Sequence, residues 1–185
     1  GLALVASGTA HFRAWPRGRR LAARLAVTGI GVAASVLPWY PGRLLGFGGE
    51  QPRRLMRDWS LNASTGQYVL EGSRRSHQWS TQCLRVPVLS LSVRRDPFAP
   101  PGAVEELLAK LESASITRIS MQGVLADPPR RRHFSWARRP EEAAAHVARW
   151  LRELPARPAI AATRERGRAP LFPYHHSEGA THVLA

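Results

Sequence analysis

The residue types best suited to acid–base chemistry in this chain are a carboxylate and a histidine, each of which follows an apolar run. Asp96 comes shortly after the run Val86 to Val93, and His133 lies in the loop after the run Ile116 to Gln122. In open sheets of parallel strands, ligands bind beyond the carboxyl ends of the strands. A carboxylate at that edge can orient an imidazole and stabilise its charged form during proton transfer. We therefore expect Asp96 and His133 to meet there.

The segment that would position these two residues alternates between strand and helix patterns. Val86 to Val93 is a strand-like run, and Ala103 to Glu112 carries apolar residues at the spacing of one buried helical stripe. Ile116 to Gln122 alternates in polarity as a second strand does. A polar loop over residues 123–139 precedes a helix that Pro140 opens. Residues 81–154 are thus predicted to form a strand–helix–strand–helix unit of the α/β class, with a parallel sheet and covering helices.

The remaining segments have different patterns. Residues 1–10 contain a short apolar run that indicates a buried core strand. Residues 11–80 are rich in arginine, proline, glycine and tryptophan, and they predict a helical insertion rather than more sheet, with helices over 19–37 and 51–61. Residues 155–185 lack any buried-face pattern and are predicted to be a disordered tail.

Several of these stretches resemble the α/β-hydrolase family. The stretch Arg85 to Pro100 is similar to the strand and turn in which the triad acid precedes a proline by four positions. The stretch His133 to Pro140 is similar to the family's histidine loop, and the family's chain order is nucleophile, acid, histidine. Trp39 to Glu50 and Leu55 to Trp59 resemble the cap insertion of a bacterial subgroup of serine hydrolases. The resemblance covers residues 1–154.

The resemblance implies a particular chemistry for the chain. It would be the C-terminal part of a serine hydrolase that cleaves an ester, thioester or amide through an acyl-enzyme, with Asp96 as triad acid and His133 as base. The sequence contains no G-x-S-x-G nucleophile elbow, so the nucleophile and oxyanion donors would come from a missing N-terminal half of the domain. The family also has glycine just before the histidine, where this chain has Arg132, which is expected to crowd the loop. The chain alone is expected to be inactive.

A substrate pocket for a small acyl molecule is the second functional element that the sequence suggests. The candidate lining residues are His11, just past the first apolar run, and the aromatic residues Trp39, Phe47 and Trp59 beneath the cap. Each has a simpler explanation, since a loop histidine is commonly solvated and aromatic residues commonly pack in a core. The same holds for Asp96 and His133, called the dyad below, because Asp-Pro commonly starts a turn and a histidine in a basic loop is commonly solvated. The histidines of the tail and His146 do not form a metal-site pattern, and we expect neither metal nor cofactor.

Composition leaves two further interpretations open. The formal net charge is +14 and Lys110 is the only lysine, so an arginine-rich binder of nucleic acid or anionic lipid is one alternative, although no nucleic-acid recognition motif is present. The other alternative is a catalytically inactive remnant or interaction module of the same fold. Cys83 is the only cysteine, so no internal disulfide can form. The apolar run Leu25 to Leu37 is too short for a transmembrane span, and we expect a cytoplasmic location.

Overall fold

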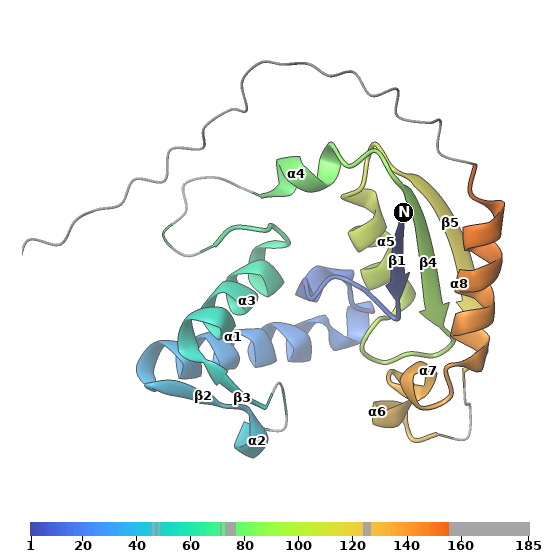
Figure 1. Ribbon diagram of the computed structural model, residues 1–185. Coiled ribbons are helices and arrows are strands. Elements are labelled where there is room, and N and C mark those ends of the chain that lie inside the picture. Colours follow the sequence, from blue (N-terminus) through green and yellow to red (C-terminus); the bar gives the residue numbers. More distant parts are fainter. Residues whose placement is uncertain (46, 48, 71, 73–76, 124–126, 156–185) are drawn as a thin grey trace, which may run out of the picture. The chain divides into compact units, whose positions relative to one another are not determined.

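The fold is built on a parallel sheet of three strands (Figure 1). The computed structural model describes residues 1–45, 47, 49–70, 72, 77–123 and 127–155. The strands are β1 (Leu2–Val5), β4 (Pro87–Val93) and β5 (Ser115–Met121), in the order β1-β4-β5. Leu2 lies opposite Val88 in one pair, and Pro87 lies opposite Ser115 in the other. Since both pairs are parallel, the carboxyl ends of all three strands lie at the same edge of the sheet.

Helices cover both faces of the central strand. Side chains of β4 alternate between the two faces and pack into separate clusters: Leu89, Leu91 and Val93 with Ala143 and Trp150 on one face, and Val88 with Val104 and Leu108 on the other. The first cluster lies under α8 (Glu141–Glu153), and the second lies under α5 (Pro101–Ala109). Burial on both faces explains why β4 is almost continuously apolar. The α/β class, the parallel sheet and the covering helices predicted from sequence are confirmed.

The segment between β1 and β4 is mainly helical, as its composition indicated. It contains two 3-10 turns, η1 (Phe12–Ala14) and η2 (Arg17–Arg19), followed by α1 (Arg20–Val36), α2 (Gly42–Leu45), α3 (Arg53–Thr65) and α4 (Gln78–Gln82). The two long helices match those predicted over 19–37 and 51–61. A departure from the prediction is an antiparallel pair of short strands, β2 (Trp39–Pro41) and β3 (Glu50–Pro52). Three residues are too few to show a strand period, and both strands end in proline.

This helical segment has a small core of its own. Ala34, Tyr40 and Met56 are buried there, and Phe47 and Trp59 pack against them. α3 ends at Gly66, whose φ of 74° is the left-handed conformation that glycine adopts readily at a helix C-terminus. The core joins α1, β2 and α3, so the segment is an organised insertion rather than a loose connection.

The loop before the last helix and the C-terminal tail are the remaining segments for which the sequence makes a structural prediction. The loop predicted over residues 123–139 contains two single-turn helices, α6 (Pro129–Arg132) and α7 (Ser135–Arg138). These were missed because one turn carries too few apolar positions to show helical periodicity. The disordered tail predicted for residues 155–185 falls, from 156 onward, outside the described residues. In the part of the chain that the structure describes, no helix is long and apolar enough to cross a membrane.

Candidate functional site

Asp96 is positioned by the sharp turn that ends β4. Arg95 has a φ of 55°, and the amide of Asp96 donates to the carbonyl oxygen of Val93 at 3.2 Å, so the chain reverses directly after the strand. The Asp96 side chain is fully buried. Its Oδ1 accepts hydrogen bonds from the backbone N–H groups of Phe98 at 2.8 Å and Ala99 at 3.2 Å. These two bonds hold one carboxylate oxygen inside the loop and leave the other directed at a partner.

That partner is His133, which lies between α6 and α7 beyond the end of β5. The distance between Asp96 Oδ2 and His133 Nδ1 is 2.7 Å, and the His133 side chain is 21% exposed. A carboxylate accepts this hydrogen bond, so Nδ1 carries the proton and the Nε2 lone pair is left for a reacting group. The adjacency expected from the sequence is present, with the acid beyond one strand and the histidine beyond its parallel neighbour.

Two phenylalanines flank the imidazole of His133. The ring of Phe98 lies 5.5 Å from it and the ring of Phe134 lies 4.7 Å from it, both in edge-to-face orientation. Both phenylalanines are themselves exposed, Phe98 by 40% and Phe134 by 56%, so the rings flank the imidazole and leave it accessible to a reacting group. Neither phenylalanine is among the site residues predicted from the sequence, although Phe98 is two residues from Asp96 and Phe134 is next to His133.

Arg132 braces this arrangement instead of crowding it. Its guanidinium donates to the carbonyl oxygens of Arg95 and Asp127, each at 3.1 Å. One of these carbonyls belongs to the residue before Asp96, so the arginine connects the acid loop with the loop that carries His133. The crowding expected from an arginine at this position is not observed, because the side chain points away from the histidine and spans the two loops.

The four residues chosen for a substrate pocket lie in different surroundings. His11 Nδ1 is 2.7 Å from Glu106 Oε1 on α5. Phe47 and Trp59 contact each other with ring centroids 4.9 Å apart, and Trp39 is 48% exposed on β2. The described contacts join Phe47 with Trp59, and no contact between His11 and the three aromatic residues is among them. The assignment of these four residues to an acyl pocket therefore stays a prediction.

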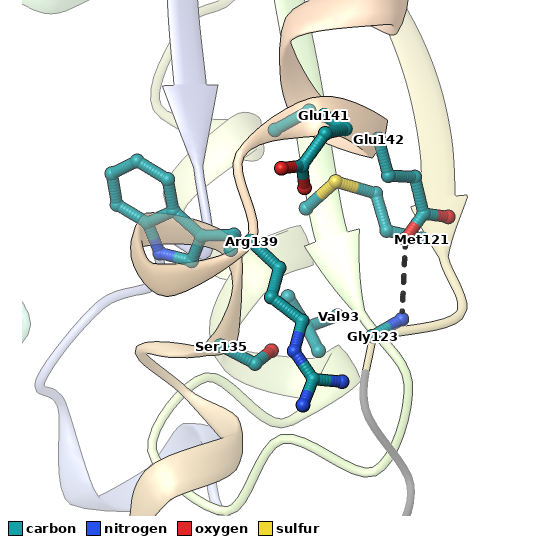
Figure 2. Close-up of a pocket in the computed structure, with 9 residues that line it drawn as sticks. Val93, Met121, Gly123, Ser135, Arg139, Glu141 and Glu142 are labelled. Carbon is teal, nitrogen blue, oxygen red and sulfur yellow. Dashed lines mark hydrogen bonds between the residues drawn. The ribbon is translucent and has the colours of Figure 1, made fainter.

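A small cavity of about 220 Å³ lies at the carboxyl ends of β4 and β5 (Figure 2), and neither Asp96 nor His133 is among its lining residues. Val93 and Met121 line it from these strands, and Ser135, Arg139 and Glu142 line it from the segment that follows β5. The Glu142 carboxylate accepts from the backbone N–H groups of residues 122 and 123, at 3.0 and 3.4 Å. Ser135 is buried, and its hydroxyl makes no hydrogen bond with any described residue. The Glu142 contact fixes the start of α8 against the end of β5 and so supports the loop that carries His133.

The residues that the structure describes include no group of three or more histidine, cysteine, aspartate or glutamate residues that could hold a metal ion. Comparison of the chain with protein-family models, with curated proteins and with solved structures finds no match. The site itself consists of a buried carboxylate that holds a partly exposed imidazole, an arrangement that can support proton transfer.

Proposed function

We propose that this chain is the acid–base part of a serine hydrolase of the α/β-hydrolase fold. The observation that carries the proposal is the 2.7 Å contact between Asp96 Oδ2 and His133 Nδ1 at the carboxyl ends of adjacent parallel strands. A fully buried carboxylate directed at a partly exposed imidazole is the arrangement that general-base catalysis needs. The same arrangement also accords with the sequence resemblance to the family's acid and histidine loops.

In this proposal His133 Nε2 removes the proton of a serine hydroxyl as that oxygen attacks the carbonyl carbon of an ester, thioester or amide. The imidazolium then gives the proton to the departing alcohol, thiol or amine, and an acyl-serine remains. Water, deprotonated by the same nitrogen, releases the acid product and restores the serine. Asp96 does not take the proton; it keeps Nδ1 protonated and stabilises the positive charge on the ring.

The serine would come from a segment that carries a G-x-S-x-G turn, a pattern that the sequence lacks. Within the described residues β1 pairs with β4 on one side, and no strand pairs with its other side. A parallel strand added there would end at the same edge of the sheet as β4 and β5. A serine in the turn after such a strand would face the dyad, and the amides of that turn would supply oxyanion donors.

The test compares the chain expressed alone with the chain expressed together with any coding sequence directly upstream of it. If the upstream segment encodes a strand, G-x-S-x-G and a helix, the longer product should hydrolyse an activated aryl ester and react with a fluorophosphonate probe. His133→Ala should remove most of the hydrolysis. Asp96→Asn should also lower it strongly but leave residual activity, because the imidazole keeps its position while its proton moves to Nε2. His146→Ala, on α8, is the matched histidine control and should retain full activity.

The outcomes separate this proposal from the inactive-remnant alternative. Absence of an upstream nucleophile segment would favour a remnant or interaction module. Full activity of His133→Ala in the longer product would rule out the assigned base.

A further inference from the structure

Helix α1 is apolar on two opposite faces. One face packs against α3 and includes the buried residues Val27 and Ala34. The opposite face is open to solvent, with large apolar side chains exposed by 69%, 64%, 57% and 72% at Leu21, Leu25, Val32 and Val36. A surface helix normally has one apolar face and one polar face. The second apolar face of α1 therefore calls for a second apolar environment.

The exposed side chains form a continuous strip along the helix. At about 100° per residue, Leu21, Leu25, Thr28, Val32 and Val36 fall within an arc of about 80°. We call these five residues the α1 stripe. Next to it, a shallow groove of about 500 Å³ lies between α1 and α3. Its apolar lining residues are Val32, Val36 and Leu61, and its other lining residues are small or polar, with Arg57 as the one charged side chain among them.

The charged side chains of the segment that contains α1 are all basic. The first 49 residues contain six arginines and no aspartate or glutamate. Four of these arginines lie at the start of α1 or just before it, and all four are exposed: Arg17, Arg19, Arg20 and Arg24. Cations at a helix N-terminus are repelled by the helix macrodipole, and the first turn of α1 contains no acidic residue to offset this. An external anion would relieve the repulsion.

We propose that α1 lies in the interface of an anionic phospholipid bilayer, with the α1 stripe among the acyl chains and the four arginines at the phosphate groups. An interfacial helix places an apolar face among the acyl chains and cationic residues at the phosphate groups. α1 has both features, since its stripe is exposed and exposed arginines lie at its start. Nucleic acid would match the arginines but would leave the apolar stripe in water, so a lipid surface accounts for both features.

The first test measures flotation of the purified chain with vesicles of phosphatidylcholine, with and without phosphatidylglycerol. The chain should bind the mixed vesicles and not the pure phosphatidylcholine vesicles. Leu25→Ser should weaken binding at least about tenfold, because an apolar side chain no longer enters the acyl region. Replacing Arg19 or Arg20 by serine should weaken it about fivefold for each arginine removed.

Matched controls lie on α8, whose exposed Leu151 and Arg152 are outside the α1 stripe. Leu151→Ser and Arg152→Ser should bind as tightly as the unchanged chain. The far-ultraviolet circular dichroism of all variants should be equal, because every substituted side chain is exposed. An equal loss of vesicle binding in the α8 variants would overturn the proposal. So would a Leu25→Ser variant that binds vesicles containing phosphatidylglycerol as tightly as the unchanged chain.

A second test reports the orientation of the helix. Cys83 is exposed and is the only cysteine, so Cys83→Ser allows a single environment-sensitive fluorophore at Leu25→Cys or, as the control, at Ala26→Cys. Vesicles containing phosphatidylglycerol should shift the emission to the blue at position 25 and much less at position 26. Equal shifts at positions 25 and 26 would indicate non-specific adsorption. A shift that occurs without vesicles and grows with protein concentration would indicate self-association. Either result would overturn the proposal.

Discussion

The guanidinium of Arg132 donates to the backbone carbonyl oxygen of Arg95 across 3.1 Å. The bond connects the residue before His133 with the residue before Asp96, across the ends of β4 and β5. Arg95 itself has a φ of 55°, a conformation that only a well-supported turn maintains in a residue other than glycine. Arg132 therefore supports both the turn that directs the carboxylate and the loop that holds the imidazole.

Arg132→Ala should loosen the contact between Asp96 and His133. Loss of two hydrogen bonds from a partly buried guanidinium should lower the free energy of unfolding by about 1 to 3 kcal/mol. The imidazole Nδ1 proton should exchange faster with water, so its downfield NMR signal should broaden or disappear. Arg131→Ala is the matched control, since Arg131 is exposed, and it should keep both the signal and the stability. An unchanged Nδ1 signal in Arg132→Ala would show that the contact between Asp96 and His133 does not depend on Arg132.

Replacing Asp96 should separate its structural role from its orienting role. Asp96→Ala leaves two backbone N–H groups and the imidazole without their acceptor, and it should lower the free energy of unfolding by about 3 kcal/mol. Asp96→Asn retains an oxygen for the backbone N–H groups and should lower it by about 1 kcal/mol. In Asp96→Asn the amide N–H₂ group facing His133 should move the imidazole proton to Nε2, which nitrogen NMR shifts report. Equal stability of the two variants, measured by urea unfolding, would contradict this account.

The sequence patterns located the long elements and the dyad because each of these rests on local signals. The apolar stripe of α5 and the strand pattern of β4 are legible within short windows, and in a parallel sheet two successive strands must end at one edge. This edge, together with the resemblance to the acid and histidine loops of the α/β-hydrolases, is why Asp96 and His133 are expected to meet.

What the patterns missed depends on contacts between distant parts of the chain. The guanidinium of Arg132 donates to carbonyl oxygens in two other turns, and the run of arginines around it does not indicate these contacts. Strands of three residues such as β2 form only because β3 is brought beside them, and single-turn helices such as α6 have no period to detect. The exposed face of α1 was likewise hidden, because a helix that is apolar on both faces has the same composition as a buried one.

Two glycines should respond in opposite ways to the same substitution. Gly66 has a φ of 74°, and a Cβ there would lie 2.8 Å from His11 Nδ1, so Gly66→Ala should lower the free energy of unfolding by about 1 to 3 kcal/mol. Gly29 lies inside α1, and a Cβ there would have nothing within 4 Å. Gly29→Ala should raise the free energy of unfolding by about 0.5 to 1 kcal/mol. Urea unfolding measures both, and the same sign for the two variants would show that α3 ends differently.

The environment of Tyr68 should make the protein less stable at alkaline pH. Burial, and next the negative charge of Glu106, raise the pKa of the Tyr68 phenol above its ordinary value of 10.0. The Glu106 carboxylate also contacts His11, and the ammonium of Lys110 lies 5.7 Å from the Tyr68 ring centre. The neutral phenol is favoured in the folded state.

The consequence for stability follows from the sign of that shift. Because the folded-state pKa is above the unfolded-state value, the stabilisation is complete below pH 10.0 and is lost as pH rises through the folded-state pKa. Other groups titrate in the same range, so the measurement is the difference between the unchanged chain and Tyr68→Phe in urea unfolding at about pH 9 and about pH 11. The unchanged chain should lose more stability between these pH values than Tyr68→Phe does. An identical loss in both would mean that the phenol is as solvated in the folded chain as in the unfolded one.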